Sequence, residues 1–354
     1  MNKLFKNIYK GKKVLVTGDT GFKGSWLCIW LHELGADVYG YALAPKTERD
    51  NFVRTNLSEV IHHHEGDIRN QSNVMDFFAD VRPDIVFHFA AQALVIPSYQ
   101  DPVETFSTNI MGTINFLEAV RKTPSVKAAV NVTSDKCYLN QNWEWGYRES
   151  DPMGGHDPYS SSKGCSELVT QSYSKSFFNS DQKCHVATAR AGNVIGGGDW
   201  SEYRIVPDFY RALINAKPIT VRNPNATRPW QHVLEPLSGY LLLAVKLLME
   251  GDNFSGGWNF GPGDSQNYKV MDVIERIVKK VPGSQYKVLE NPERFYESQS
   301  LKLDISKAVA LLGWKPRLDF EETIDFTIAG YKDELEGKNV YESRVRQINQ
   351  YMAK

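Results

Sequence analysis

A tyrosine and a lysine stand four positions apart in the segment YSSSK, as Tyr159 and Lys163. On a helix this spacing places both side chains on one face, so that the phenol and the ammonium are neighbours. A free phenol has a pKa of about 10, and a nearby positive charge favours the phenolate and lowers that pKa. The pair therefore predicts a site at which Tyr159 moves a hydroxyl proton and Lys163 adjusts its acidity.

A glycine-rich turn near the start of the chain reads TGDTGFKG over residues 17–24. Gly18 permits a tight turn, Gly21 lets the backbone approach a pyrophosphate, and Gly24 allows a helix to pack closely on a strand. The helix that follows offers N–H groups and a positive dipole end to an anion. A glycine-rich turn without a ligand is the alternative. Strand, turn and amphipathic helix occur in the order that a dinucleotide site requires, so we expect such a site here.

The elements that must position these residues follow a repeating pattern. Short apolar runs alternate with longer amphipathic segments, which is typical of βαβ units on a parallel sheet. The pattern predicts strands over 13–17, 37–41, 85–89, 128–133 and 185–190, and helices over 22–34, 103–120, 158–178, 237–249, 271–280 and 305–312. We therefore predict an α/β protein with a Rossmann-type, doubly wound parallel sheet and a smaller mixed α/β C-terminal substrate lobe.

The sequence pattern changes after Gly192, where a run of three glycines and several prolines interrupt the alternation of apolar and amphipathic segments. We expect an NAD-binding Rossmann domain over 1–192, to which segments near 234–262 return. The remainder, 193–354, is expected to form mainly a nucleotide-sugar-binding lobe. The chain after Asp333 is moderately polar, and we expect elements of this tail to be mobile.

Composition excludes several classes of protein. The 354 residues carry 41 basic and 42 acidic side chains, a net charge of -1 that disfavours a nucleic-acid binder. The four cysteines are widely spaced and form no CxxC pair, which predicts a reducing, cytoplasmic location. We expect no signal peptide and no membrane span, because no apolar run is long enough. The adjacent histidines at 62–64 are poorly spaced for one ion, so we predict no metal.

The wide spacing between Gly18 and Gly21 resembles that in the extended short-chain dehydrogenase/reductase superfamily, whose glycine turn typically reads TGxxGFxG. The resemblance implies NAD as the cofactor and Thr133 as the residue that binds the substrate hydroxyl. The implied cofactor contacts are Gly18, Gly21, Phe22, Lys23, Gly24, Asp67, Ile68, Ala90, Ala91, Gln92, Asn109, Tyr159 and Lys163.

The second strand lacks the acid that normally binds the adenosine ribose, since neither Tyr41 nor Ala42 is acidic. These residues do not distinguish NAD from NADP, so NAD follows from the resemblance alone. Asp67 matches the adenine-contacting acid of the superfamily, and a helix-capping aspartate is the alternative.

The segment 133–138, TSDKCY, resembles the nucleotide-sugar 4,6-dehydratases, which usually have Asp-Glu where this chain has Asp135 and Lys136. The Asp-Lys pair and the runs 190–200 and 227–233 are similar to the CDP-glucose 4,6-dehydratases. The implied reaction converts CDP-glucose to CDP-4-keto-6-deoxyglucose by C4 oxidation, water elimination across C5–C6 and hydride return to C6. It also implies a place in deoxysugar biosynthesis for lipopolysaccharide O-antigen. A 4,6-dehydratase or 4-epimerase that acts on another nucleotide sugar is the alternative.

The pair Asp135 and Lys136 carries the elimination in this interpretation. Asp135, if a dry site keeps it protonated, is placed to act as general acid at C6. Lys136 has two candidate roles: a neutral lysine removes the C5 proton, whereas a charged one stabilises the enolate. A solvated loop ion pair is the alternative for both residues. Cys137 is expected to be a buried packing residue rather than a reactive thiol.

Arginine suits the diphosphate of a nucleotide sugar because its planar fork contacts two phosphate oxygens. The predicted substrate contacts are Ser134, Asn193, Arg222, Arg228, His232 and Arg294. A dinucleotide-binding regulator without catalysis is a different class, and the presence of Tyr159 and Lys163 argues against it. The resemblance further implies a homodimer or a dimer of dimers, assembled through the helices over 103–120 and 158–178.

Overall fold

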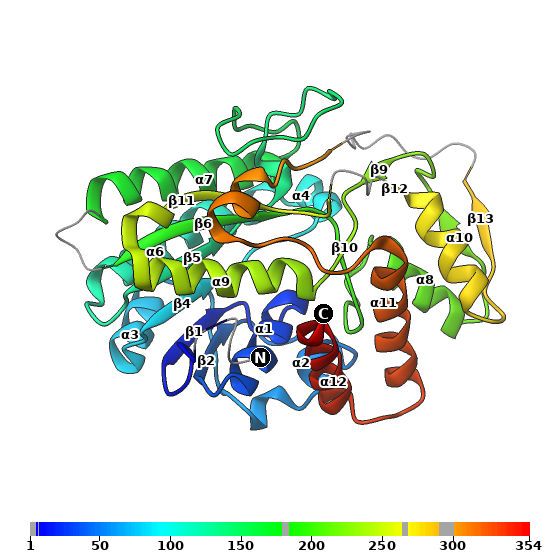
Figure 1. Cartoon of the computed structure of the whole chain (residues 1–354), viewed down its shortest axis with the longest axis horizontal. Helices are drawn as coiled ribbons and strands as arrows, with labels where there is room; N and C mark the ends of the chain where they lie inside the picture. Colours follow the sequence, from blue (N-terminus) through cyan, green and yellow to red (C-terminus); the bar gives the residue numbers. More distant parts are fainter. Residues whose placement is uncertain (1–4, 6, 179–183, 264–267, 290–300) are drawn as a thin grey trace.

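Seven parallel strands form one central sheet in the computed structural model, which describes residues 5, 7–178, 184–263, 268–289 and 301–354 (Figure 1). The strand order is β11-β6-β5-β4-β1-β2-β3. These strands are β1 (Lys13–Thr17), β2 (Asp37–Ala42), β3 (His62–Glu65), β4 (Ile85–His88), β5 (Ala128–Val132), β6 (His185–Ala191) and β11 (Gly256–Phe260). The order reverses between β1 and β4, which confirms the predicted doubly wound, Rossmann-type α/β fold.

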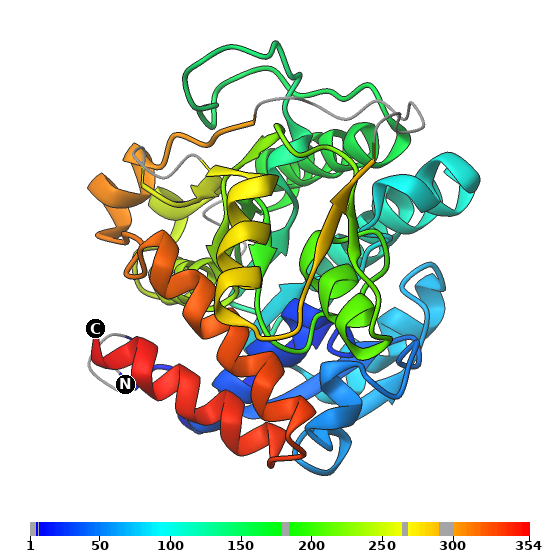
Figure 2. The same cartoon turned by 90° about the vertical axis from the view of Figure 1, so that its right-hand side faces the viewer.

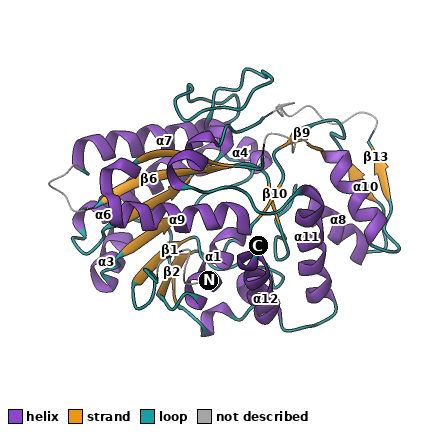
Figure 3. Cartoon of the chain, viewed as in Figure 1, coloured by secondary structure: helices purple, strands orange, loops and turns teal. Residues whose placement is uncertain are grey.

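Helices cover both faces of this sheet, so its strands lie between two helical layers (Figure 3). One layer contains α1 (Phe22–Glu33) and α9 (Leu234–Glu250), with α12 (Val340–Ala353) packed against α1. The other contains α3 (Gln71–Val81), α6 (Gly112–Lys122) and α7 (Pro158–Phe177). Alternate residues of β1 serve the two layers: Val14 and Val16 belong to the first core and Leu15 to the second.

The long helix α7 begins where its sequence supplies a cap and a proline. Asp157 accepts a hydrogen bond from the backbone N–H of Ser160 at 2.9 Å, and Pro158 occupies the first turn. The face that α7 buries against the sheet repeats every four residues and includes Tyr159, Lys163 and Glu167. The capped start of α7 thus sets the height of these side chains above the sheet.

The C-terminal half adds a smaller lobe, which faces the viewer in Figure 2. This lobe has its own apolar core. Its helices are α8 (Ile205–Ile214), α10 (Val270–Lys280) and α11 (Phe320–Leu335). Its short strands pair as β7 (Val194–Ile195) with β10 (Gln231–His232), β8 (Ile219–Val221) with β13 (Tyr286–Val288), and β9 (Thr227–Arg228) with β12 (Tyr268–Lys269). Tyr210 and Tyr331 stack at 3.9 Å in this core.

Short helical segments complete the described chain. They are α2 (Asn51–Arg54), η1 (Leu57–Glu59), α4 (Val95–Gln100), α5 (Pro102–Phe106), η2 (Ser107–Met111), η3 (Asp135–Cys137), η4 (Gly251–Phe254) and η5 (Ala308–Leu312). The helix predicted over 103–120 is therefore not uniform, because the π-helical turn η2 separates α5 from α6. Within the described ranges, no helix combines the length and the apolar character that a membrane crossing requires.

The mobility expected of elements after Asp333 stays a prediction. Most of this segment forms α12, in which Arg344 is fully buried and Tyr351 packs edge-on against Trp30 at 5.8 Å. Several polar residues of this segment are buried, among them Ser343 and Gln347. The division of the chain at residue 192 stays a prediction, although β11 pairs with β6 and so extends the main sheet.

Candidate active site

The predicted site residues follow three neighbouring strands at the carboxyl edge of the sheet. The glycine turn follows β1, residues 89–92 follow β4, and the turn 133–137 follows β5. The strand order reverses between β1 and β4, and ligands of open α/β sheets bind in the crevice at such a point.

The glycine turn has no space for side chains at its first and third glycines. Gly18 has φ +77°, and a Cβ there would lie 2.7 Å from the backbone nitrogen of Ala90. A Cβ on Gly24 would lie 2.1 Å from the carbonyl oxygen of Gly18. Gly21 precedes α1, and the first turn of that helix, which is fully described, contains no acidic residue. This compact, glycine-lined helix start fits a pyrophosphate.

An acidic side chain that was not among the predicted site residues lies beneath this turn. Asp19 is fully buried, and its Oδ2 is 2.7 Å from Nδ1 of His63 on β3. Burial raises the pKa of Asp19, while the hydrogen bond and the charge of His63 lower it. A Cβ on Gly40 would lie 2.1 Å from the same carboxylate oxygen. The middle histidine of the run 62–64 therefore anchors the turn.

The described residues contain no group of three or more His, Cys, Asp or Glu side chains that could hold a metal ion. The other two histidines of the run 62–64 contact neighbouring side chains. His62 lies 3.2 Å from Asp37, and His64 stacks on Tyr41 and on Phe77, which also contact each other.

Asp67 and Ile68 lie between β3 and α3. Arg69 pairs with the Asp67 carboxylate, and the Tyr41 hydroxyl donates to the Asp67 carbonyl at 3.2 Å. The helix-cap alternative for Asp67 is wrong, because Asn70 caps α3. The Ile68 side chain is buried and packs against Gly112.

Asn109 joins the loop after β4 to α7. Its Oδ1 accepts from the Gln92 backbone N–H at 2.9 Å, and its Nδ2 donates to the Gln92 carbonyl at 3.0 Å and to Ser162 at 2.8 Å. The same loop carries Ala90 and Ala91, both half-buried. Asn109 thus fixes the loop against the helix that carries the predicted catalytic pair, while its amide is already occupied by protein groups.

Tyr159 and Lys163 are both buried at the edge of the sheet. Burial raises the pKa of Tyr159 to about 12, although a hydrogen bond with Ser134 and the charge of Arg204 lower it. Burial also lowers the pKa of Lys163 to about 8, against the opposing charge of Glu167. In the protein alone, burial thus outweighs the charge of Arg204. The lowering of the Tyr159 pKa, which was expected from Lys163 and the nicotinamide together, stays a prediction.

The turn after β5 places its hydroxyl groups differently. The Thr133 hydroxyl donates to Oε1 of Glu167, whereas the Ser134 side chain hydrogen-bonds with Tyr159. Ser134 also donates to Oδ1 of Asp135 at 2.9 Å. The hydroxyl that lowers the pKa of the predicted reactive phenol is thus that of Ser134.

Asp135 is buried, and its Oδ2 has no hydrogen-bond partner among the described residues. Burial raises its pKa, which the charges of Lys136 and Arg228 and a hydrogen bond with Ser134 oppose. The alternative of a solvated ion pair is therefore wrong for Asp135. Lys136 is half-buried beside it. Cys137 is fully buried and burial raises its pKa, so the packing role is confirmed.

Two further cations face this region. Burial and the charges of Arg204 and Lys163 lower the pKa of Lys23 to about 7, whereas the charge of Asp135 raises it. Arg204 pairs with Asp199 at 3.0 Å, and its charge acts on Tyr159. Arg204 was not among the predicted site residues, since a single arginine after the triple glycine carries no motif signal.

The predicted substrate residues fall into different environments. Arg228 is buried, and its charge acts on Asp135, whereas Arg222 is 43% exposed and lies 3.7 Å from Asp208. Asn193 is half-buried in the loop before β7. His232 is fully buried, edge-on to Trp26 and Phe326, which suits support of the lobe rather than contact with a ligand. Arg294 lies outside the described residues.

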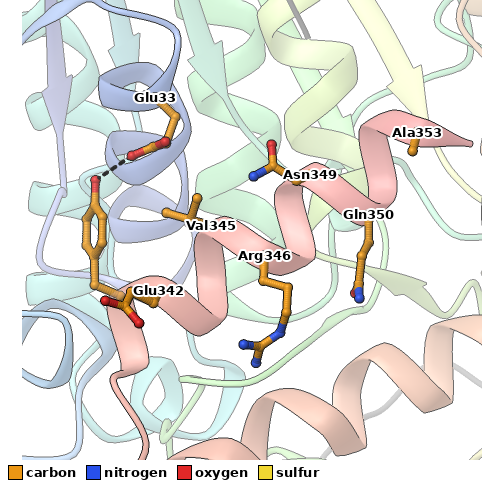
Figure 4. Close-up of a pocket in the computed structure, with 8 residues that line it drawn as sticks. Glu33, Glu342, Val345, Arg346, Asn349, Gln350 and Ala353 are labelled. Carbon is orange, nitrogen blue, oxygen red and sulfur yellow. Dashed lines mark hydrogen bonds between the residues drawn. The ribbon is translucent and has the colours of Figure 1, made fainter.

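A groove of about 630 Å³ lies elsewhere, between the end of α1 and the helix α12 (Figure 4). The Tyr341 hydroxyl donates to Glu33 at 3.0 Å across it. Glu33 is the last residue of α1, which begins at the glycine turn, so the groove and the turn lie at opposite ends of that helix.

Comparison with known proteins decides the family. The family model described as GDP-mannose 4,6 dehydratase matches residues 15–327. The chain belongs to this family. It is 47% identical over 352 residues to the CDP-glucose 4,6-dehydratase of Salmonella typhimurium (strain LT2), with 98% of each protein covered. UDP-glucuronic acid decarboxylase 1 of Xenopus tropicalis is more distant, at 28% identity over 92% of this chain and 73% of that protein.

Solved structures of related enzymes share the fold. An epimerase from Methanothermobacter thermautotrophicus has a TM-score of 0.79 at 25% identity and covers 94% of this chain and 96% of its own. The UDP-glucose 4-epimerase of Thermus thermophilus, solved in complex with NAD, has a TM-score of 0.76 at 26% identity and covers 90% and 99%. Members of this dehydratase family thus share their architecture with nucleotide-sugar epimerases.

Proposed function

We propose that this chain is a CDP-glucose 4,6-dehydratase that converts CDP-glucose to CDP-4-keto-6-deoxyglucose with NAD as its cofactor. The near full-length match to the Salmonella enzyme of that name supports the substrate. The buried Asp135 carboxyl, with its unpartnered Oδ2 beside Lys136, supports the elimination. An epimerase has no need for a general acid at this position, where burial raises the pKa of the carboxyl group.

The glycine turn would hold the pyrophosphate of NAD, because backbone occupies the places where side chains at Gly18 and Gly24 would lie. Asp67 and Ile68 would contact the adenosine, and Tyr159 and Lys163 would contact the nicotinamide ribose. Bound NAD would supply a hydride acceptor for C4 and a hydride donor for C6, with a proton returned to C5 in the last step, and its nicotinamide would add a positive charge beside Tyr159.

Tyr159 takes the proton from the C4 hydroxyl in the first step. Its buried phenol has a pKa of about 12, so the positive charges around it must favour the phenolate when the proton moves. Ser134, which hydrogen-bonds with the phenol, is the residue best placed to orient the C4 hydroxyl. The Thr133 hydroxyl donates to Glu167, so it can bind the C4 hydroxyl only as an acceptor.

Asp135 acts in the elimination. The C4 ketone acidifies the C5 hydrogen, and the C5 proton leaves as the C6 hydroxyl departs. Asp135 gives its proton to that hydroxyl, which leaves as water, and burial favours the protonated carboxyl that this step needs. Lys136 either takes the C5 proton as a neutral amine or stabilises the enolate as a cation.

The lobe over 193–354 binds the nucleotide sugar in this proposal, with Arg228 on the diphosphate and His232 supporting the loop. The enzyme works in the cytoplasm as a homodimer or a dimer of dimers. Exposed apolar side chains on α5 and α7, such as Val103 at 76% and Leu168 at 54% exposure, supply a surface for that assembly.

Incubation with CDP-, UDP-, dTDP- and GDP-linked hexoses tests the function, with products followed by NMR. We expect a 4-keto-6-deoxy product from CDP-glucose alone; inversion at C4 would overturn the proposal in favour of an epimerase. Asp135→Asn should lower kcat by about 10²–10⁴. Asp252→Asn, at an exposed site beside His185, is the matched control and should retain activity.

Solvent deuterium entry at C5 separates the two roles of Lys136. We expect Lys136→Ala to lose this exchange if the lysine is the base. Exchange that persists in Lys136→Ala while product formation falls assigns Lys136 to the enolate.

A further inference from the structure

Glu167 is the third ionisable residue on the buried face of α7, one turn beyond Lys163 and two beyond Tyr159. Its side chain is 4% exposed, and none of the predicted catalytic or binding roles includes it. Burial of a carboxylate costs free energy unless the carboxylate is paired and hydrogen-bonded, so its partners matter.

Four donors surround the Glu167 carboxylate. Arg190 on β6 donates from Nε at 2.9 Å and from Nη2 at 2.8 Å, which makes a two-pronged ion pair. Thr188, also on β6, donates to Oε2 at 2.7 Å, and Thr133 donates to Oε1. Both carboxylate oxygens are therefore satisfied, and the carboxylate links β6, α7 and the turn after β5.

Arg190 is itself held on its other side. Its Nη1 donates to the Tyr138 hydroxyl at 2.6 Å, and the guanidinium lies 5.0 Å from the centre of the Tyr138 ring. A Cβ at Gly257 on β11 would lie 2.3 Å from Nη2, so the neighbouring strand leaves space for the guanidinium by having glycine there. The fold thus holds the arginine, and through it the carboxylate, in one position.

We propose that Glu167, held by Arg190, is a positioning residue of the active site that fixes the turn 133–137 through Thr133 and maintains the positive charge of Lys163. The turn carries Ser134, Asp135 and Lys136, so a displaced Thr133 moves three predicted catalytic groups together. This inference rests on the proposed dehydratase function.

The charges around Lys163 support the second part of the proposal. The groups that act on it or face it are Lys23 from α1, His88 from β4, Cys137 from η3 and Glu167 on its own helix. Burial holds His88 and Cys137 in their neutral forms at pH 7. Glu167 is then the negative charge of this set, and it opposes the effect of burial on the Lys163 pKa, which stands at about 8.

A buried ion pair can also be purely structural, and a second pair in this chain provides the matched control. Glu334 on α11 pairs with Arg344 on α12 at 3.4 Å, with side chains 3% and 0% exposed. Its burial is close to that of Glu167 and Arg190, whose side chains are each 4% exposed. Glu334→Gln therefore removes an equally buried carboxylate charge from a different part of the fold.

The test compares Glu167→Gln, Glu167→Asp and Glu334→Gln with the unmodified enzyme. Three measurements are made between pH 6 and pH 10: kcat and KM for CDP-glucose, Kd for NAD by calorimetry, and the thermal midpoint. We expect Glu167→Gln to move the alkaline limb of kcat and of NAD affinity to lower pH by about one unit. At pH 8 this shift lowers kcat about fivefold. KM should change little.

The control and the conservative variant separate charge from structure. Glu334→Gln should lower the thermal midpoint and leave both alkaline limbs where they are. Glu167→Asp keeps the negative charge and should keep both limbs despite a lower kcat. If Glu167→Gln lowers the thermal midpoint but leaves both limbs unmoved, the positioning role is overturned and the pair is structural.

Two outcomes keep this proposal distinct from the proposed function. If the unmodified chain binds NAD but does not convert CDP-glucose, the function fails, and the NAD profiles still decide the role of Glu167. If Glu167→Gln does not fold, Thr133→Val breaks the link between Glu167 and the turn without a change of charge. It should then lower kcat about tenfold with unchanged NAD affinity, and an unchanged kcat would overturn the proposal.

Discussion

Thr133 donates its hydroxyl proton to the carboxylate of Glu167, and this bond turns the Thr133 side chain toward α7 and β6. The next residue, Ser134, hydrogen-bonds with Tyr159 instead. Two adjacent hydroxyl groups thereby serve different purposes: one holds the turn in place and the other faces the predicted reactive phenol. The two residues should respond differently to substitution.

Ser134→Ala should lower kcat by about 10²–10³, because it removes the hydroxyl that hydrogen-bonds with Tyr159 and orients the substrate. Thr133→Val should cost about 1–3 kcal/mol of stability, since it leaves a buried carboxylate oxygen without one donor, and should lower kcat only about tenfold. Steady-state kinetics and urea unfolding on both variants check this. The reverse order of kcat losses would return the substrate-binding role to Thr133.

Arg228 and Arg222 provide a contrast within the lobe. Arg228 is buried and its charge acts on Asp135, whereas Arg222 is 43% exposed and near Asp208. Arg228→Met should therefore raise KM for CDP-glucose about ten- to a hundredfold. This factor corresponds to the free energy that a hydrogen bond to a charged group contributes. Arg222→Met should change KM less than Arg228→Met does. Equal effects on KM would mean that Arg222 also reaches the diphosphate.

Gly24→Ala should weaken NAD binding about ten- to a hundredfold, which corresponds to about 1–3 kcal/mol of overpacking. The added Cβ would lie 2.1 Å from the Gly18 carbonyl oxygen, and backbone cannot move aside without a change in the turn. Gly263→Ala is the control, since among the described residues no atom beyond its chain neighbours lies within 4 Å of a Cβ there. Calorimetric titration with NAD measures both, and normal affinity in Gly24→Ala would count against the turn as the pyrophosphate site.

A buried carboxyl far from the chemistry makes stability depend on pH. Glu235 on α9 accepts from the backbone N–H groups of Arg317 at 2.9 Å and Leu318 at 2.6 Å, and from the Tyr351 hydroxyl at 2.8 Å. Burial raises its pKa from 4.5 to about 7. Between these values the folded chain holds a proton that the unfolded chain has lost, so stability falls as pH rises through this range.

The size of this loss is about 3 kcal/mol, at about 1.4 kcal/mol for each unit of the shift from 4.5 to about 7. Glu235→Gln keeps an acceptor for the two backbone N–H groups and removes the titration. Its free energy of unfolding should therefore vary less between pH 5 and pH 8 than that of the unmodified chain. Urea unfolding at both pH values measures this, and equal pH dependence in the two proteins would contradict it.

The parallel sheet could be predicted from sequence because its strands are short, apolar and separated by amphipathic segments. The strands at 13–17 and 128–132 and the helix at 158–177 were found almost to the residue, since Pro158 and the polar residues before it mark the start of α7. β3 was missed because three histidines and a glutamate do not resemble a strand. It pairs with β2 at the edge of the sheet, where solvent tolerates polar side chains.

The sequence by itself determined the chemistry of this protein: a glycine turn between strand and helix, a tyrosine and a lysine one helical turn apart, and an acid beside a lysine after β5. These are local patterns, and local spacing is what a chain specifies before it folds. Three features depended on the tertiary structure alone. These are the choice of Ser134 over Thr133 as the hydroxyl near Tyr159, the burial of Asp135, and the ion pair between Glu167 and Arg190. Burial and charge pairing depend on residues far apart in the chain, here 23 positions for Glu167 and Arg190, so no local pattern contains them.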